Sequence, residues 1–532
     1  MGGISKQPAH LRLPTQVADA ENAQFTAAWG ISKRPGTRYM TNVGTTRIWF
    51  PADITGTFAV GDTITQGGTT GTVISVQQET ISTVVNTWLT VQAGSGTFSA
   101  SGTIFGPSGT GTGVVESQWA AGAALRLYPF AFSKDEKYLM VLSAGGIPRV
   151  FPIGSATGTE AEVSYSAGAA DTYMAAGSPT AHDYRFATKE FFILIANSKQ
   201  RIEGSNVGRA ILATTMPHNL KREGKSPLRF SLNVTSWTTS PGTLANNPLP
   251  NVFWDNGATN KTNTTTSYYI DDMIIFRGRL FLGCGTAGIF SQAGTFYNFY
   301  LSASAPTVND DDPIQVEMPG KTTHTIDRVI GMNRSLVVFT KTGRQFEFSS
   351  AETLTPGSGS FTESTAYTLR PGVAPAVIGN SIVFASSKRT SGVIYQYPYN
   401  DSQVTKASED VSAHVEGLLP IDLFRVATSP NDGMTFALAA STPTTLYVHR
   451  EEWIGGNRVQ SAWTKWTFSG VSRICDIAVV DSTLYMLNET ETSAQFVLES
   501  MKLGSLNATA TQSLDEGAGY SNAADVTDYA SE

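Results

Sequence analysis

The chain has 532 residues, 50 of them glycine, and a charged fraction of only 15%. With abundant Ser and Thr and 10% aromatic residues, this balance indicates an all-β protein rather than a helical one. The apolar fraction of 41% is enough for a large core and excludes a disordered chain. The formal net charge of −7 argues against a surface built to grip nucleic acid.

The given sequence shows no pattern typical of a targeting segment. The N-terminal stretch lacks the apolar core of a signal peptide, and no run of 18 apolar residues predicts a membrane span. We therefore expect the protein to fold in a cytoplasm. Cys284 and Cys475 lie far apart inside apolar segments, and we expect buried free thiols rather than a disulfide.

Residues 1–50 form a polar arm in which prolines exclude a long helix. Only the stretch from Val17 to Trp29 could carry a short helical piece. The basic pair Lys33-Arg34, followed by Pro-Gly, is typical of a solvated turn. Because the arm has no core of its own, we expect it to lie across a neighbouring subunit or an adaptor.

Residues 51–118 differ in composition from the preceding arm and contain an internal repeat at a spacing of forty positions. The matched pairs are Phe58 and Phe98, Ile64 and Ile104, and Gly71 and Gly111. Each copy alternates Thr, Val or Ile with glycine turns, which predicts a small inserted β-barrel or sandwich domain. With almost no charge and no histidine, this domain is interpreted as a surface or contact module.

Residues 119–500 contain recurring β-hairpins, whose turns are expected near Asp135, Lys189, Gly278, Asn333, Asn380, Asp432 and Asp481. From Gly278 onward the turns are 47 to 55 positions apart. Blades of β-propellers run roughly 40–50 residues, so we predict a β-propeller-like body of six to eight blade units. An irregular blade around Leu232 to Trp237 would fill the wider gap before Gly278. The alternative is a run of β-sandwiches with similar spacing.

The hairpin that begins at Asp271 is the clearest unit. Met273 to Phe276 is an apolar run, Arg277-Gly278 is a two-residue turn, and Arg279 to Leu282 runs back. A second turn is expected at Ala287-Gly288.

Two segments near the C-terminus can be interpreted from their composition. Trp463, Trp466 and Phe468 are expected in the core of a blade, because alternation places Trp466 and Phe468 on one face. Residues 501–532 are small and acidic, which predicts a flexible tail or a docking arm.

Residues for chemistry are sparse. The six histidines, at positions 10, 182, 218, 324, 414 and 449, have no metal-site spacing, and no nucleotide-binding or nucleophile motif is present. The densest acidic cluster is Asp310-Asp311-Asp312, with Asp271-Asp272 upstream. A glycosidase would need two such carboxylates facing one cavity, and the calcium-loop pattern is missing. We interpret the triplet as a polar loop between blades whose aspartate caps a turn. The sequence thus predicts no catalytic, cofactor-binding or metal-binding residue, and no enzyme.

A series of motifs follows one order along the chain: GGISKQPAHLRLP, ISKRPGT, SKDEKYLMVL, AHDYRFATKEFFILIANS, TTMPHNLKRE, NPLPNVFW, DDMIIFRGRLFLG, FYNFY, NDDDPIQV, EDVSAHVEGLLPIDLFRVA, LYVHREEW and VQSAWTKW. No single motif is diagnostic, but the ordered series resembles the tail nozzle proteins, also called tail tubular protein B, of short-tailed bacteriophages. The resemblance covers roughly residues 1–50 and 120–500. The stretch 51–118 departs from it as an insertion, and the chain ends soon after Met501.

The resemblance implies a structural protein of the virion, made in the cytoplasm of the bacterial host. Such proteins assemble as a homohexameric ring below the tail adaptor ring, near tail fibres or tailspikes, and genomic DNA leaves through the lumen. An acidic or neutral lumen would let DNA slide, since each Lys or Arg contact to phosphate adds affinity. Two alternatives stay open: a receptor- or glycan-binding tail protein, commonly trimeric, and a propeller glycan hydrolase.

Overall fold

The computed structural model describes most of the chain, namely residues 3–7, 16–26, 30–52, 54–81, 84–95, 97–119, 122–154, 160–165, 172–202, 204–205, 210–211, 213–225, 228–233, 237–238, 269–300, 308–320, 322–332, 334–350, 353–398, 408–455, 457–491 and 495–503. Regular structure in these ranges is mostly β-strand, as predicted. The helical pieces are short: α1 (Thr172–Ala175), η2 (Ala181–Asp183), η4 (Ala213–Thr215), η6 (Ala413–Val415) and η7 (Pro430–Asp432).

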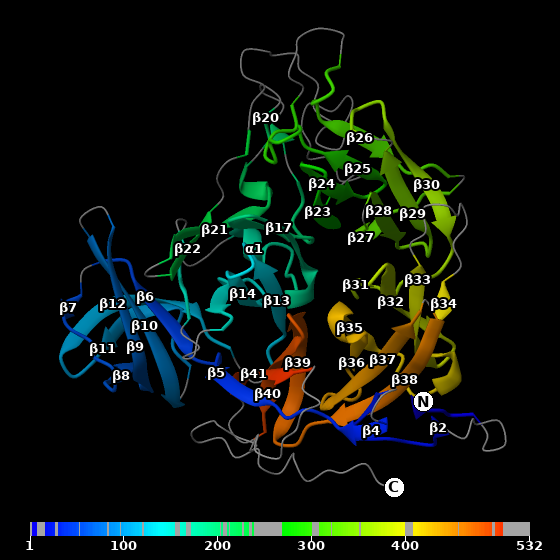
Figure 1. Cartoon of the computed structure of the whole chain (residues 1–532). Helices are drawn as coiled ribbons and strands as arrows, with labels where there is room; N and C mark the ends of the chain where they lie inside the picture. Colours follow the sequence, from blue (N-terminus) through cyan, green and yellow to red (C-terminus); the bar gives the residue numbers. More distant parts are fainter. Residues whose placement is uncertain are drawn as a thin grey trace.

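Seven sheets, antiparallel except for one strand of blade 2, stand around one axis as the blades of a β-propeller (Figure 1). We number them in chain order. Blade 1 consists of β13 (Leu125–Ala131), β14 (Lys137–Ser143) and β15 (Arg149–Pro152). Blade 2 consists of β17 (Tyr184–Lys189), β18 (Phe192–Asn197), β21 (His218–Lys225), β22 (Leu228–Asn233) and, parallel to β22, β16 (Glu162–Tyr165). Blade 3 consists of β23 (Asp272–Phe276), β24 (Arg279–Cys284), β25 (Ala287–Phe290) and β26 (Ile314–Glu317).

The other four blades have four strands each. Blade 4 consists of β27 (Ile326–Met332), β28 (Ser335–Thr340), β29 (Gln345–Ser350) and β30 (Gly359–Thr365). Blade 5 consists of β31 (Ala376–Ile378), β32 (Ser381–Lys388), β33 (Ser391–Pro398) and β34 (Glu409–Asp410). Blade 6 consists of β35 (Leu423–Ser429), β36 (Met434–Ala439), β37 (Thr445–Ile454) and β38 (Asn457–Thr467). Blade 7 consists of β39 (Val471–Val480), β40 (Thr483–Thr490), β41 (Phe496–Lys502) and β5 (Arg38–Asn42).

Each of the seven predicted hairpins joins the two innermost strands of one blade, so the predicted propeller is confirmed. The extra blade expected around Leu232 to Trp237 is wrong. Leu232 lies on β22, an outer strand of blade 2, and Trp237 packs in the core between blades 2 and 3. Blade 2 has five strands, which accounts for part of the wide gap; a small ribbon, β19 (Gly204–Ser205) with β20 (Ala210–Ile211), also falls within it.

The hydrophobic core is divided among the seven junctions between neighbouring blades. Seven clusters of buried side chains each draw on two adjacent blades; one joins blade 7 to blade 1 through Leu487, Leu498, Leu127 and Leu139. Both free cysteines lie in these clusters, as expected for buried thiols. A blade therefore buries its apolar faces only when both neighbours are present.

The structure tests two predictions about short segments, namely the burial of the aromatic residues in and just after β38 and the positions of the turns in blade 3. Trp463, Trp466 and Phe468 are buried in core clusters, as predicted. The turn at Arg277-Gly278 is confirmed, with positive φ at both residues (46° and 74°). The turn expected at Ala287-Gly288 is wrong, because both residues lie within β25. A side chain at Gly288 would place its Cβ 2.5 Å from the Phe281 ring, so this glycine permits close strand contact rather than a turn.

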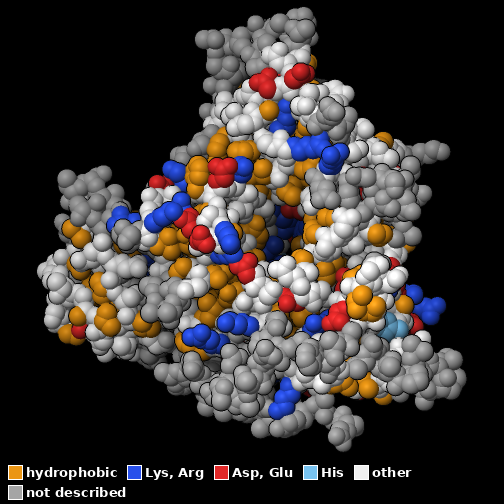
Figure 2. All heavy atoms as spheres, in the orientation of Figure 1, with side chains coloured by type: hydrophobic (Ala, Val, Ile, Leu, Met, Phe, Trp, Pro, Cys, Tyr) orange, Lys and Arg blue, Asp and Glu red, His pale blue; other side chains and the backbone are white. Residues whose placement is uncertain are grey.

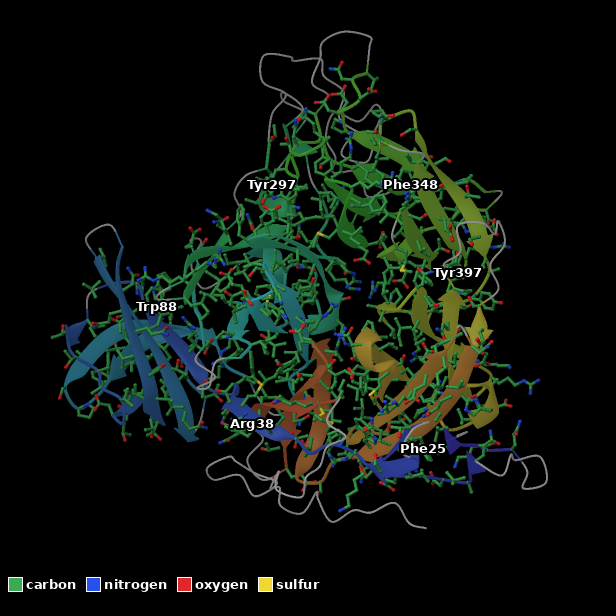
Figure 3. All side chains as sticks on the ribbon, in the orientation of Figure 1. Phe25, Arg38, Trp88, Tyr297, Phe348 and Tyr397 are labelled. Atoms are coloured by element: carbon green, nitrogen blue, oxygen red, sulfur yellow. The ribbon has the colours of Figure 1, made fainter. Side chains whose placement is uncertain are left out.

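The N-terminal arm closes the propeller. β5 pairs with β41 as the outermost strand of blade 7, so the two ends of the described chain share one sheet. Upstream, β1 (Gly3–Ile4) pairs with β2 (Gln16–Val17), and β3 (Ala23–Thr26) pairs with β4 (Gly30–Lys33). We call residues 16–42 the strap. It runs below blades 6 and 7 in Figure 1, and Figure 3 labels Phe25 and Arg38 on it.

Two predictions for this arm are wrong. The described part of the Val17–Trp29 stretch forms strands rather than a helix, because its backbone pairs with β4 and lies along β38. Gln460 Nε2 donates to Phe25 O over 2.7 Å, and Trp466 Nε1 donates to Ala23 O over 2.9 Å. Arg34 is no solvated corner: it donates to Thr467 O over 3.2 Å. The strap therefore lies on its own propeller.

The inserted domain is a closed barrel beside the propeller, with Trp88 labelled in it (Figures 1 and 3). Its strands close in the order β8 (Thr63–Gln66), β9 (Thr69–Ile81), β10 (Val84–Ser95), β6 (Thr46–Phe50), β12 (Gly109–Ser117) and β11 (Ser101–Phe105), which returns to β8; β7 (Thr55–Gly56) adds to β12. The repeated residues Phe58, Phe98, Ile64 and Ile104 all lie in its core, so the repeat reflects two copies of one core-filling unit.

The barrel begins at Thr46 rather than after residue 50, because β6 supplies one of its strands. The predicted tail, residues 501–532, falls beyond the described residues from position 504 onward.

Candidate functional site: a polar ring at the centre of the propeller

The innermost strands of the blades are β13, β17, β23, β27, β31, β35 and β39, and β13 contacts β39 to complete the circle. Figure 2 shows a hollow near the middle of the molecule, with Lys or Arg side chains inside it. Charged side chains from the inner strands and their leading loops gather around this axis.

Five arginines each reach a backbone carbonyl oxygen of the next blade. They are Arg126 to Tyr184 O (2.5 Å), Arg185 to Asp271 O (2.7 Å), Arg328 to Gly372 O (2.9 Å), Arg370 to Leu423 O (2.9 Å) and Arg425 to Ile477 O (3.0 Å). These bonds cross the junctions between blades 1 and 2, 2 and 3, 4 and 5, 5 and 6, and 6 and 7. A guanidinium is suited to this role because its several donors reach carbonyls in a fixed plane.

Two aspartates bridge the two remaining junctions. Asp272 on blade 3 accepts from Val329 N on blade 4 over 2.8 Å, and Asp476 on blade 7 accepts from Leu127 N on blade 1 over 2.8 Å. Each also accepts from the amide of the residue that follows it. All seven junctions are therefore bridged by a charged side chain, and we call these seven residues the inner ring.

Burial sets the electrostatics of the inner ring. Burial, followed by repulsion from neighbouring arginines, lowers the pKa of Arg126 to about 9 and that of Arg185 to about 10. Burial raises the pKa of the Asp272 carboxyl, although Arg328 and Arg185 oppose the shift. Arg425 and Asp476 form an ion pair over 2.9 Å. Buried charges persist only where hydrogen bonds or partners compensate them, and the inter-blade bonds supply much of that compensation.

The acidic triplet lies elsewhere. Asp310, Asp311 and Asp312 follow β25 and precede β26, so the loop lies within blade 3 and the predicted position between blades is wrong. All three carbonyl oxygens accept hydrogen bonds from the buried Arg279 guanidinium. Asp312 Oδ2 accepts from Asn309 N over 2.9 Å, which confirms the predicted turn cap.

The candidate residues for other chemistry are scattered. Asp271 accepts from Gly285 N, whereas Asp272 belongs to the inner ring, so the structure does not join this pair to the triplet. His10 is outside the described residues; the other histidines lie in separate places on η2, β21, the loop before β27, η6 and β37. Within the described ranges, no group of three or more His, Cys, Asp or Glu residues could hold a metal ion.

Sequence reasoning missed the inner ring. A signal was present: Arg126, Arg185 and Arg425 each interrupt an apolar stretch near the start of a predicted hairpin, and Arg328 stands at a similar place. One arginine in an apolar strand is uninformative. Its recurrence at the same place in four of seven units indicates a position that faces a shared centre.

Comparison with known families decides the identity. The model of the bacteriophage nozzle protein family matches residues 1–58 and 200–522, which include the strap, the barrel strands β6 and β7, and most of the propeller. The chain belongs to this family. The interval that the family model leaves unmatched contains most of the barrel, blade 1 and part of blade 2.

A curated relative of this nozzle protein is the tail tubular protein gp12 of Escherichia phage T7. It is 24% identical over 290 residues, which span 54% of this chain but only 34% of the T7 protein. Among solved structures, the WD40 domain of Toxoplasma gondii coronin matches 73% of the chain at 12% identity with a TM-score of 0.36. The propeller domain of Myceliophteria thermophila Cps50 (Swd1) matches 72% at 9% identity with the same TM-score. Such scores carry no argument, and the blade count rests on the strand pairing.

The family makes the nozzle protein a structural component of a phage tail and therefore of the virion. Among the helices of the described residues, none is long and apolar enough to cross a membrane.

Proposed function

We propose that the protein is the subunit of a homohexameric nozzle that lies below the adaptor ring of a short-tailed phage. Genomic DNA would leave through the lumen of this ring into the host, without specific binding to the protein. The observation that carries the proposal is the family match, which spans both the strap and the propeller body.

The construction of the propeller supports a wall-forming role. Seven apolar junctions hold the blades, the inner ring bridges each junction at the centre, and β5 completes the sheet of blade 7 by pairing with β41. A wall subunit must keep its shape while DNA passes. The sheet of blade 7 combines strands from two parts of the chain that are far apart in sequence. Such a sheet resists opening, because its outer edge is covered by a paired strand.

The barrel is proposed as a contact module toward a neighbouring subunit, the adaptor ring, or tail fibres or tailspikes. The start of the barrel, at Thr45 and β6, is bound to blade 1. Arg149 donates to Thr45 O over 2.9 Å, and Glu160 pairs with both Arg149 and Arg47. Burial alone would raise the pKa of Glu160, but the two arginines outweigh it and hold the pKa below its usual range. A firmly held attachment is what a projecting contact domain needs.

Charge supports passage of DNA. Six copies of a chain with net charge −7 make an acidic assembly, and an acidic or neutral lumen does not add phosphate contacts. Mapping of the side chains that face the lumen of the assembled ring tests this part. A continuous lining of Lys and Arg would contradict it.

The oligomer is tested by the mass of the purified assembly, formed with the adaptor, together with end-on electron-microscope views. We expect six copies and a six-fold ring. A three-fold particle that binds glycans would favour a receptor-binding tail protein instead, and release of sugar from host surface glycans would favour a hydrolase.

A further inference from the structure

Two arginines of the inner ring converge on one place between blades 1 and 2. Arg126 Nη1 donates to Tyr184 O over 2.5 Å and approaches His182 O at 3.4 Å. Arg185 Nη1 donates to His182 O over 2.7 Å and to Tyr184 O over 3.1 Å. Because both guanidiniums address the same two carbonyl oxygens, they are close neighbours.

This pair of guanidiniums lacks the paired carboxylate that two other arginines of the ring have. Arg425 has Asp476 at 2.9 Å, and Arg328 has Asp327 at 3.3 Å. In the described part of the chain, no carboxylate lies within ion-pair distance of Arg126 or Arg185, and both are more than nine-tenths buried. Arg126 Nε is also buried and has no hydrogen-bond partner there.

The charge balance around the axis leaves an excess of positive charge. Five arginines belong to the inner ring, against four carboxylates: Asp272, Asp476, the adjacent Asp327, and Asp183, which acts on Arg185. Arg126 and Arg185 repel one another, and Arg328 adds to the repulsion at both. Burial of like charges is costly unless a counter-charge is present, so the arrangement favours an anion from solution.

We propose that Arg126 and Arg185 form a binding site for a small tetrahedral oxyanion, of the phosphate class, at the centre of the propeller. The unpartnered Nε of Arg126 and the remaining donors of both forks would address its oxygens, in the bidentate geometry that guanidiniums offer to phosphate. Figure 2 shows Lys or Arg side chains in the hollow near the middle of the molecule, so positive charge is present there. Bound there, the ion would tie blade 1 to blade 2 and strengthen the ring.

Isothermal titration calorimetry of the full chain with inorganic phosphate, in chloride buffer at constant ionic strength, tests the site. We expect saturable binding at a single site per chain, accompanied by broadening of the phosphate phosphorus resonance. Thymidine 5′-monophosphate in a second titration distinguishes a free ion from a phosphate carried by a larger molecule, and binding of either supports the site. Absence of saturable binding to the unaltered chain in both titrations would overturn the proposal.

Variants locate the site. Arg126→Gln and Arg185→Gln should each weaken phosphate binding about tenfold or more, since each removes charge-assisted hydrogen bonds. Arg334→Gln is the matched control, because Arg334 is exposed on the turn between β27 and β28. If the glutamine variants fail to fold, Arg126→Lys keeps the charge but loses the fork and should still weaken binding. Unchanged affinity in a folded Arg126 or Arg185 variant, or equal loss in Arg334→Gln, would refute the assignment.

Discussion

At the scale of single residues, Asp476 is the more deeply buried of the two aspartates of the inner ring. It is fully buried, accepts from the amides of Leu127 and Ile477, and pairs with Arg425. Asp476→Ala would leave a buried guanidinium unpaired and two amides without an acceptor. We expect a loss of about 3–5 kcal/mol in the free energy of unfolding, measured by urea denaturation.

The control for this change is Glu363→Ala, which removes an ion pair with Arg344 in which both side chains are exposed. Exposed pairs contribute about 0–1 kcal/mol, so this variant should unfold close to the unaltered chain. Equal effects of the two substitutions would show that the inner ring does not stabilise the blade junctions.

A buried histidine makes stability depend on pH. Burial, with smaller contributions from His414 and Arg458, lowers the pKa of His449 to about 3. The centroid of its ring lies 4.9 Å from that of Trp463, and its Nε2 atom lies 2.9 Å from Ser461 Oγ. Because the folded-state pKa is below the ordinary value of about 6.5, the stabilisation is present above pH 6.5 and is lost as pH falls below it.

From pH 7 to pH 5 this one group should cost about 2 kcal/mol of unfolding free energy. His449→Gln should reduce the pH dependence by about that amount, measured by urea denaturation at both pH values. His182, whose pKa burial lowers to about 4, acts in the same direction and remains in the variant. Identical pH dependence in the variant and the unaltered chain would contradict the account.

At the scale of elements, the strap is the part on which closure depends. Deletion of residues 1–42 removes β5 from β41 and uncovers the edge of blade 7, together with the surface of β38 that holds Phe25. We expect faster hydrogen exchange at the amides of β41 that face β5, and a lower melting temperature.

Blade 4 serves as the control within the same molecule, because its four strands pair without the strap. Exchange in β28 and β29 should stay near that of the intact chain. If β41 stayed as protected as before, closure by β5 would not contribute to stability.

The barrel is expected to be dispensable for the propeller fold. Its core consists of its own residues, and its ends lie together, since Thr46 Oγ1 and Gln118 Oε1 are 3.3 Å apart. A chain in which a short Gly-Ser linker replaces residues 46–117 should fold into a propeller, with a melting temperature close to that of the full chain. Circular dichroism and thermal melting check this, and aggregation or loss of the cooperative transition would show that the barrel is part of the propeller.

The elements that the sequence could predict are those with local signals. The seven hairpins follow from apolar runs that flank turn residues, and the barrel follows from a repeat whose matched residues fill one core. The strap could not be predicted, because β5 and β41 pair across more than four hundred residues, and local composition does not record such a partner. The inner ring escaped for a related reason: each arginine finds its acceptor in a different blade.

At the scale of the whole molecule, the propeller is stabilised by contacts at three distances from its axis. The inner ring bridges the junctions at the centre, apolar clusters fill the spaces between blades, and the strap holds the outer seam of blades 6 and 7. Contacts within one chain thus bridge every blade junction, which suits the proposed role as a subunit of a ring through which DNA passes.

The central claim is that six such subunits form the nozzle of a phage tail. An electron-microscope map of the intact tail, at a resolution that separates strands, tests it most directly. We expect six copies in a ring below the adaptor, each with a seven-bladed propeller closed by β5, around a lumen without a continuous Lys and Arg lining. A single copy, a three-fold arrangement, or a position outside the path of the DNA would contradict the account.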